Sequence, residues 1–596
     1  MGLMQKACET YEANLSRAGQ VFEAGATLCP VGHILQKAQL EILLDEKGKF
    51  LGAQAVTKED SRTVIPATEK SASRSGSQPT AHPFSDQLQY LSGMNGERHE
   101  RYLKELEKWL AFDPQPDLQA VHRYILGGTI LQDLESAGLY GSGKKIQNMD
   151  APQWLVRWVI DGRQAWRNSA LIDSFCRYLT SQNQSPQGLC MISGEEGALC
   201  FSHDKGIIAA CNGAKLISSN DTSNFTYRGR FEDAVQACTI SSAASQKAHR
   251  ALQWVAAAQG ETIADRTFVC WNPQGKKVSR PQDPFGKKKE NAPVFTVPTD
   301  FYQELHTTLA GYRNELPREA GIVTAIFSAA TTGRLSLTYY SELSGSDFYD
   351  RVEDWYQSCC WFFGKFGIEA PPLRQIAECA FGTERKKYLE APPKLLGETT
   401  QRLLTCMLNR DPIPEDIVKQ LFRNASTLQR YSEQSNRIRV LCTACAVIRK
   451  YHNDRAQKEE WTMGLDDEKG KKDRSFQFGR LLAVMEHVER TTYDPEETRE
   501  PNAIRLQSVF NERPLHTAKL IDGQLNPYFA RLKPGLRKYY KDLISQILAT
   551  IYATTPDNSE WDRPLKDTYL LGYYLQRAEL YTKKNQTPKE TEDDEP

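Results

Sequence analysis

The sequence predicts an α+β protein, with mixed α/β N-terminal and central regions that contain small antiparallel sheets, followed by a C-terminal helical bundle. Three observations lead to this prediction. Short strand patterns alternate with helical ones up to residue 275, a helix and two strands open the region 294–455 before helices take over, and only helical spacing remains after residue 463. A chain of 596 residues is too long for one core, so several domains are expected.

The N-terminal region, 1–275, is expected to contain short elements. Two of its strands are joined by a turn in which Gly48 can take a positive φ. Apolar spacing of three and four predicts that residues 97–185 are helical. In order, the expected elements are a helix within 1–30, strands at 39–45, 49–56 and before Pro66, helical segments at 99–112, 118–137, 154–160 and 169–179, a strand at 214–220, a helix at 242–260 and a strand at 267–271.

The second half begins after a basic, proline-containing linker, 276–293. The central region, 294–455, and the C-terminal bundle, 463–588, follow it, and an acidic tail, 589–596, ends the chain. The expected elements are a helix at 301–311, strands at 322–327 and 334–340, and helices at 350–363, 372–381, 398–408, 414–422, 437–451, 475–490, 536–552 and 568–581.

The charge balance limits how the chain can hold a polyanion. Lys plus Arg and Asp plus Glu both number 75, so the net charge is zero and a nucleic acid would have to be held by local patches. The 14 cysteines follow no repeating frame, which is typical of reduced thiols in a cytoplasmic protein. The longest apolar run is far too short to span a bilayer, so no membrane partner is expected.

The segment 190–254 carries one concentrated set of nucleic-acid-binding side chains. The expected strand 214–220 ends in lysine, serine and asparagine, and the aromatic and arginine residues that follow it suit the stacking of unpaired nucleotides. The candidate contact residues are Lys215, Ser218, Asn220, Tyr227, Arg228, Lys247 and Arg334.

The helix 242–260 would place Lys247, Arg250 and Trp254 opposite its apolar face. An alternative interpretation stays open, in which Trp254 covers the edge of the domain and both cations are simply solvated.

A second concentration of positive charge lies in the bundle, from 519 to 541. Aromatic residues are interleaved with the cations, which suits a single strand held without base preference. Amphipathic helices with basic outer faces are the alternative. The candidates are Lys519, Arg531, Lys533, Arg537, Lys538 and Lys541, against the single acid Asp522.

No catalytic motif stands out, so the protein is not expected to be an enzyme, and neither a cofactor nor a metal is expected. A zinc site at Cys190, Cys200, His203 and Cys211 lacks the short paired spacing of structural zinc, and packed thiols are favoured. Cys442 and Cys445 fall on one helical stripe, which favours core packing over redox chemistry. The sequence contains no phosphate-binding GxxxxGK[ST] loop.

An ordered set of short motifs extends over most of the chain. They are Cys190-Met-Ile-Ser-Gly194, Ala214-Lys-Leu-Ile-Ser-Ser-Asn220, Phe225-Thr-Tyr-Arg-Gly229, Ser245-Gln-Lys-Ala-His249, Gly333-Arg-Leu-Ser-Leu337, Phe478-Gly-Arg-Leu-Leu482, His516-Thr-Ala-Lys519, Leu571-Gly-Tyr-Tyr-Leu-Gln-Arg577 and Leu580-Tyr-Thr-Lys583. In this order they resemble the large subunit of the type I-C CRISPR interference complex, the Cascade of the Dvulg subtype.

The resemblance implies a non-catalytic subunit in antiviral defence. It implies as partners the guide CRISPR RNA, target double-stranded DNA and its displaced single strand, the backbone and guide-processing subunits of Cascade, and a recruited helicase-nuclease. It also implies a separately translated small subunit identical to the C-terminal bundle, for which Met463 is the expected internal start because Met485 would begin inside a helix.

The resemblance further assigns a role to the polar segment 69–83. Its composition alone predicts a loop that connects surface elements. In the family the corresponding loop faces the duplex flank called the protospacer-adjacent motif, and the side chains here suit phosphates and base edges. The candidate residues are Lys70, Ser73, Arg74, Ser75 and Gln78.

Two other classes of function stay open. A divergent metal-dependent nuclease would cleave DNA with magnesium or manganese and would depend on single carboxylates. A purely scaffolding protein would show no loss of DNA binding when Lys533, Arg537 and Lys538 become alanine.

Overall fold

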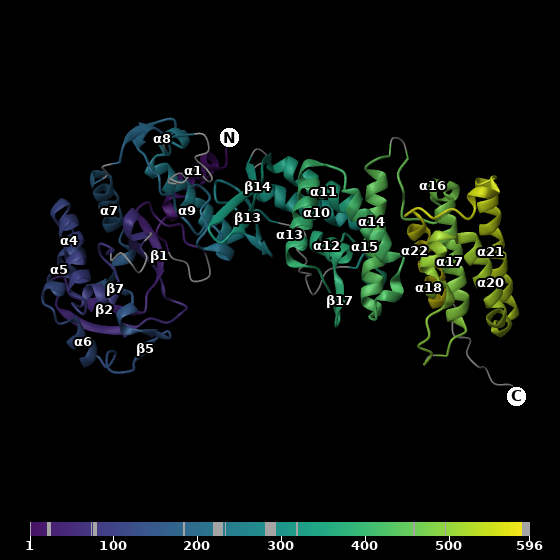
Figure 1. Cartoon of the computed structure of the whole chain (residues 1–596), viewed down its shortest axis with the longest axis horizontal. Coiled ribbons are helices and arrows are strands. Elements are labelled where there is room, and N and C mark those ends of the chain that lie inside the picture. Colours follow the sequence, from purple (N-terminus) through teal and green to yellow (C-terminus); the bar gives the residue numbers. More distant parts are fainter. Residues whose placement is uncertain are drawn as a thin grey trace. The chain divides into compact units, whose positions relative to one another are not determined.

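The computed structural model (Figure 1) describes residues 2–20, 26–72, 74, 80–182, 185–218, 231–232, 234–279, 294–316, 320–456, 459–494 and 496–586. The chain forms two compact units: unit 1 comprises Met1–Val278 and Gly321–Glu342, and unit 2 comprises Ser279–Ala320 and Leu343–Pro596. Helices predominate, the sheets are small, and the C-terminal part is helical, so the predicted α+β class is confirmed. The finer division into five segments stays a prediction.

Unit 1 contains a four-stranded sheet in the order β3-β2-β7-β8, in which β8 is the short strand Arg163–Gln164. β2 (Leu40–Leu44) and β3 (Phe50–Ala55) form the predicted hairpin, and β7 (Val156–Ile160) pairs with β2 in parallel. The prediction of a helix at 154–160 is therefore wrong. All five residues of β7 are buried, including Arg157, which pairs with Glu41, and a short, mostly apolar run that is buried on both faces cannot be assigned by its periodicity.

Helices enclose the core of this sheet. The core includes Trp109, Trp154, Trp158 and Phe175, and the indole of Trp109 donates to Ser174 Oγ at 3.0 Å. The predicted helix 118–137 is two helices, because Gly128 at φ +67° interrupts it. The helices are α4 (Gly96–Phe112), α5 (Pro116–Leu126), α6 (Ile130–Ser136) and α7 (Ser169–Gln182).

A second sheet of unit 1 has the order β11-β12-β13-β14. α1 and α9 pack with it around a core that contains Trp271 and Phe327. The side chain of Ser241 caps α9 by accepting from Ala244 N at 3.3 Å. The elements are α1 (Leu3–Ala13), α9 (Ser242–Gln259), β11 (Glu261–Ile263), β12 (Arg266–Trp271), β13 (Gly321–Thr331) and β14 (Arg334–Ser344).

The strand expected at 214–220 is not present in its described part, 214–218. Within 214–218, only Lys215 forms β-bridges, an antiparallel one with Lys205 and a parallel one with Arg334.

A two-stranded ribbon, β1 (His33–Lys37) and β4 (Arg62–Pro66), supplies the strand predicted before Pro66.

The first part of unit 2 is a group of helices with two small hairpins. The helices are α10 (Pro298–Glu315), α11 (Gly345–Ser358), α12 (Leu373–Phe381), α13 (Pro393–Asn409), α14 (Glu415–Ala425) and α15 (Gln434–Asn453). The hairpins pair β15 (Trp361–Phe362) with β16 (Ile368–Glu369) and β17 (Thr383–Arg385) with β18 (Tyr388–Glu390).

The bundle of unit 2 is built around α17 (Arg474–Thr491), which is buried on nearly every face. A Cβ on Gly479 would lie 1.9 Å from Tyr569 O, and a Cβ on Gly572 would lie 2.1 Å from Phe476 O. The two glycines therefore let α17 and α22 approach closely. The other helices are α16 (Glu468–Lys472), α18 (Asn502–Arg505), α19 (Gln507–Glu512), α20 (Pro514–Arg531), α21 (Pro534–Thr554) and α22 (Tyr569–Gln586).

Candidate nucleic-acid interface

The base of the loop 69–83 is tied together by Arg74. Its guanidinium donates to both carboxylate oxygens of Asp86, at 2.7 and 2.8 Å, and to Thr80 O at 3.0 Å. It also lies 4.8 Å from the centre of the Tyr90 ring. Asp86 is fully buried and accepts two further bonds, from the backbone N of His82 and of Gln87. Arg74 thus joins the two ends of the segment 75–79.

A second contact ties the same ends. His82 Nδ1 lies 2.9 Å from Ser71 Oγ, and burial lowers the pKa of His82 to about 4. Lys70 lies on the short helix α2 (Glu69–Ala72) and is exposed. Ser73, Ser75 and Gln78 lie outside the described residues.

Backbone pairing at Lys215 brings basic residues from three segments of unit 1 close together, namely Lys205, Lys215 and Arg334. Its backbone N donates to Gly333 O at 3.1 Å, and its backbone O accepts from Leu335 N at 3.0 Å, which places Arg334 beside it. The bridge with Lys205 adds an exposed lysine that sequence reasoning missed, because a pairing across the chain leaves no spacing signal. The pairing therefore places Lys205 and Arg334 on segments that flank Lys215.

The segment α2 lies within electrostatic reach of the same cluster. Desolvation raises the pKa of Glu69, and the charge of Lys215 opposes that rise. Unit 1 therefore brings Lys215 near the start of the loop 69–83. The side chain of Lys215 donates to Ser202 Oγ at 3.1 Å.

The other candidates of the segment 190–254 have different positions. Ser218 is partly buried, whereas Asn220, Tyr227 and Arg228 lie outside the described residues. Lys247 pairs with Glu12 at 2.9 Å.

The expectation of an outward face with Arg250 and Trp254 is wrong. Arg250 is 7% exposed and Trp254 is 9% exposed, because neighbouring segments cover this side of α9. Arg250 Nη2 lies 3.3 Å from Asp204 Oδ2, and Ser245 Oγ lies 2.8 Å from Nδ1 of buried His203. This side of α9 belongs to a buried polar cluster.

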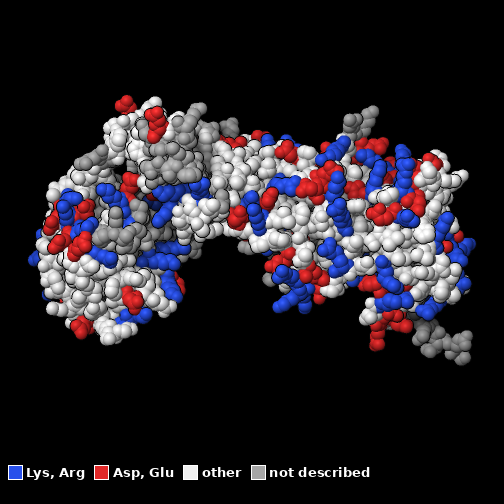
Figure 2. Space-filling view, in the orientation of Figure 1, with Lys and Arg blue, Asp and Glu red and all other residues white. Residues whose placement is uncertain are grey.

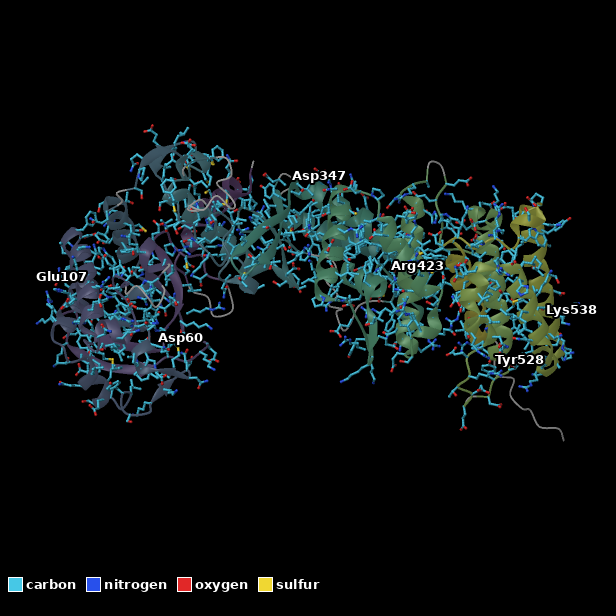
Figure 3. All side chains as sticks on the ribbon, in the orientation of Figure 1. Asp60, Glu107, Asp347, Arg423, Tyr528 and Lys538 are labelled. Carbon is cyan, nitrogen blue, oxygen red and sulfur yellow. The ribbon has the colours of Figure 1, made fainter. Side chains whose placement is uncertain are left out.

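The six cations predicted in the bundle lie on α20, on α21 and on the turn between them. Figure 3 labels Lys538 of α21 and the aromatic residue Tyr528 of α20. All are exposed except Arg537, which is partly buried and donates to Ala530 O and Leu532 O at the end of α20. Arg531 lies 5.9 Å from the Tyr528 ring centre, and the Lys541 ammonium lies 5.4 Å from that of Phe529.

This basic surface of the bundle is not neutralised by the described part of the chain. No carboxylate among the residues in the described ranges pairs with any of the six cations. Several Lys and Arg side chains lie along the outer edge of the bundle in Figure 2. Exposed Leu536 and Tyr539 lie between the cations, so charge and apolar area alternate there.

Arg499 is a further cation beside this surface that sequence reasoning missed, but its charge is paired, because its Nη2 lies 3.3 Å from Oε1 of buried Glu489. It donates to the Tyr528 hydroxyl and lies 5.5 Å from the ring centre of Tyr493. Its position 29 residues before Tyr528 gives no periodic signal.

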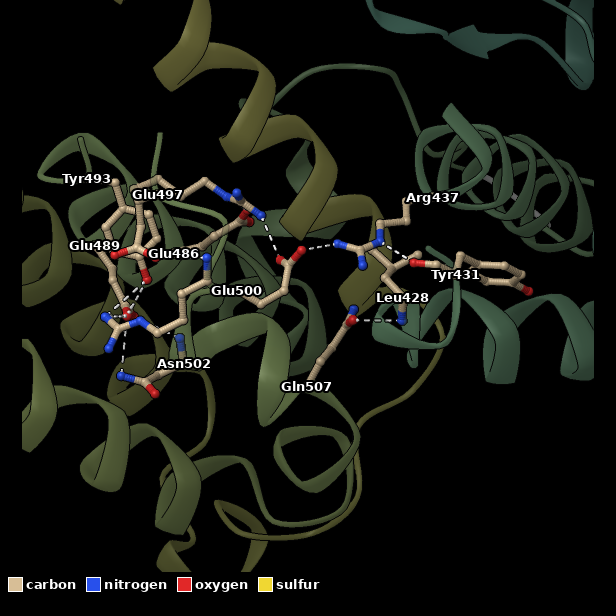
Figure 4. Close-up of polar contacts among 12 residues, drawn as sticks. Leu428, Tyr431, Arg437, Glu486, Glu489, Tyr493, Glu497, Glu500, Asn502 and Gln507 are labelled. Atoms are coloured by element: carbon tan, nitrogen blue, oxygen red, sulfur yellow. Dashed lines mark hydrogen bonds and ion pairs between the residues drawn. The ribbon is translucent and has the colours of Figure 1, made fainter. Parts of the chain in front are cut away.

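A buried network explains the motif Leu571–Arg577 as structural, because Tyr573 and Arg577 both contact Glu486. Figure 4 shows Glu486 with the neighbouring carboxylates Glu489 and Glu500. Burial alone would raise the pKa of Glu486, but Arg577 and Arg490 hold it below its ordinary value. Tyr573 donates to the same carboxylate. Glu500 accepts from Arg437 of α15 and from Arg490 of α17 and so connects these helices.

The thiols and the start residue complete the predicted sites. Cys442 and Cys445 are buried in α15, as predicted, and burial raises the pKa of Cys442 to about 12. Within the described ranges, no three His, Cys, Asp or Glu side chains are grouped so that they could hold a metal ion. Met463 lies in the connector before α16, two residues after Trp461, a buried residue that packs on Phe476.

Comparison with known proteins gives one result for nearly the whole chain. The family model described as CRISPR-associated protein (Cas_Csd1) matches residues 8–581. A search of the curated proteins found no match. None of the helices that the structure describes is long and apolar enough to cross a membrane.

Proposed function

Because the chain belongs to the Cas_Csd1 family of CRISPR-associated proteins, the large subunits of type I-C Cascade, as its ordered motifs predicted, we propose that it recognises the flanking motif of duplex DNA and holds the displaced strand. It would support R-loop formation beside the guide RNA and the other Cascade subunits, and would help to recruit the helicase-nuclease. It would perform no bond cleavage itself.

The energetics favour such a division of labour. Pairing of the guide with one DNA strand replaces DNA pairing at nearly balanced free energy. Modest protein contacts to the flank and to the displaced strand can therefore decide whether opening proceeds.

The basic surface of α20 and α21 is the observation that supports a displaced-strand role most directly. Its cations lack carboxylate partners among the described residues, and aromatic rings lie next to them. Unpaired strands are held by such combinations, with the cations at phosphates and the rings under bases.

The flanking-motif role is supported by the base of the loop 69–83. Arg74 binds Thr80 and Asp86, so the described residues on either side of 75–79 are held together, and Glu69 at the start of the loop lies within electrostatic reach of Lys215. We propose that the loop contacts the duplex flank, with Lys70 at a phosphate and Arg74 as the residue that positions the loop.

The test compares single-strand binding by two triple variants of the full chain. The triple variant Lys533→Ser, Lys538→Ser, Lys541→Ser should bind a labelled single strand more weakly. The slope of the logarithm of its binding constant against the logarithm of the salt concentration should be shallower by about 2. The control replaces Arg101, Lys104 and Lys108 of α4 by serine, which removes the same charge from another surface. Equal effects of the two triples would contradict the displaced-strand role, and unchanged binding would favour a scaffolding protein.

The same preparation tests the nuclease alternative. Incubation with DNA and magnesium or manganese should leave the DNA intact. Cleavage that a single carboxylate substitution abolishes would refute the proposal of a non-catalytic subunit.

A further inference from the structure

The hairpin of β17 and β18 projects from the helices around it in unit 2 (Figure 1). Its two-residue turn is Lys386-Lys387, with Arg385 and Tyr388 paired across the ends of the strands. All four residues are exposed, and Tyr388 is 72% exposed, more than any other large apolar side chain in the described ranges. Figure 2 shows Lys and Arg side chains gathered at the end of this hairpin.

The base of the hairpin is held firmly. Glu384 accepts from the backbone N and Oγ of Ser432, both at 2.6 Å, from Glu433 N at 3.1 Å and from Asn436 Nδ2 at 2.7 Å. Desolvation would raise the pKa of Glu384, but the bonds from Asn436 and Ser432 lower it to about 2. Leu389 is buried beside it. The tip is thus carried on an anchored support.

The residues of the turn are unusual for its geometry. Lys386 has φ +56°, a left-handed conformation that tight hairpins usually assign to glycine or asparagine. Among the described residues, Lys386 and Lys387 have no carboxylate partner, whereas Arg385 pairs with Glu390 at 3.3 Å. Positive charge is therefore concentrated where the turn itself does not favour lysine.

A structural explanation accounts for only part of this arrangement. Lysines on a short exposed hairpin discourage pairing with another strand. That role gives no reason for a tyrosine exposed beside them, because an exposed ring adds apolar area at the edge. A ring next to three cations is instead the combination that binds an unpaired nucleotide, since the base stacks and the phosphates are neutralised. A continuous duplex offers no open base face to such a ring.

We infer that the tip of this hairpin, Arg385–Tyr388, is a binding site for single-stranded nucleic acid, with Tyr388 under a base and the flanking cations at phosphates. The inference deepens the proposed function, because it adds to the bundle a second place in unit 2 that holds an unpaired strand.

The test uses fluorescence anisotropy to measure how the full chain binds two labelled oligonucleotides of thirty nucleotides each, dT30 and rU30. Tyr388→Ala should weaken binding about fivefold or more, whereas Tyr388→Phe should bind as the unchanged chain does, since it keeps the ring. Lys386→Ser with Lys387→Ser should make the slope of the logarithm of the binding constant against the logarithm of the salt concentration shallower by about 1.4. The two oligonucleotides distinguish a DNA strand from an RNA strand.

The matched control is Lys104→Ser with Lys108→Ser on α4, which removes the same charge elsewhere. Photocrosslinking with an oligonucleotide that carries 5-bromouracil should label the peptide containing Tyr388. If the hairpin variants bind like the control while the triple bundle variant binds weakly, the hairpin inference is wrong and the proposed function stands. If the unchanged chain binds neither oligonucleotide, both are wrong. Equal losses for Tyr388→Ala and Tyr388→Phe would contradict stacking.

Discussion

Arg74 illustrates how a residue chosen for its chemistry can act through the chain itself. Its charge and its place in a polar loop suggested contact with DNA, yet its guanidinium binds the carboxylate of Asp86, a buried residue 12 positions later. The donor geometry that suits a guanine edge suits a carboxylate equally well. The guanidinium of Arg74 binds a carboxylate here because the fold places Asp86 beside it.

Loss of Arg74 should therefore destabilise unit 1. Arg74→Ala leaves the buried Asp86 carboxylate without its cation, and we expect a loss of about 3 kcal/mol in the free energy of unfolding. Urea denaturation would measure it. Arg98→Ala is the control, because Arg98 also lies over Tyr90, at 5.5 Å, but has no carboxylate partner among the described residues. Equal losses for the two variants would contradict a structural role for the Arg74–Asp86 pair.

His82 should make stability depend on pH. Burial lowers the pKa of folded His82 to about 4, whereas an unfolded histidine titrates near 6.5. Asp86 opposes this shift and Arg74 supports it. Between these values the unfolded chain binds the extra proton, so stability is full above about pH 6.5 and falls as the pH approaches 4, by about 3 kcal/mol at most.

Denaturation series at several pH values would measure the effect of His82. His82→Gln should remove about one proton from the pH dependence of unfolding over this interval. A variant with the dependence of the unchanged chain would show that His82 is protonated in the folded state.

At the scale of elements, the contact between α17 and α22 explains two sequence motifs. The glycines of Phe478–Leu482 and Leu571–Arg577 lie where each helix touches the backbone of the other, and Glu486, Tyr573 and Arg577 form the polar network beside that contact. A glycine in a helix interior is unfavourable unless close packing requires it.

Adding one methyl group at this contact should be costly. Gly479→Ala should destabilise the bundle by about 1–3 kcal/mol or more, because the new Cβ would overlap Tyr569 O. Thermal denaturation would measure it. Gly523→Ala in α20 is the matched control, since nothing lies within 4 Å of its Cβ, and it should be neutral or stabilising by about 0.5–1 kcal/mol. A Gly479→Ala variant as stable as this control would contradict the close approach.

Sequence patterns predicted most elements but not all of them. Helices with sustained spacing, such as α15 and α17, were recognised because their apolar residues recur over many turns. β7 was mistaken for a helix because its five buried residues show no alternation. The strand expected at 214–220 is absent from its described part, 214–218, where Lys215 forms only single β-bridges with distant segments.

At the scale of the whole molecule, Met463 bears on how many products the coding sequence yields. We propose that translation from Met463 makes the bundle separately, because this residue precedes α16 and every later helix. Replacing Met463 by leucine should remove a short C-terminal product, detected on a gel with a C-terminal tag. Met485→Leu is the control, and a short product that survives the Met463 change would contradict the proposal.

The sequence by itself determined the family, the α+β class and the absence of long membrane-spanning apolar runs, because these depend on composition, ordered motifs and local periodicity. It also located the cations of 519–541. Only the tertiary structure decided which cations are available to bind a partner. Arg74 and Arg250 pair with carboxylates of their own unit, whereas Lys533 and Lys538 pair with none of the acids that the structure describes. The reason is physical, since the pairing of a charge depends on which distant carboxylate the fold brings within a few ångströms, and no linear pattern records that distance.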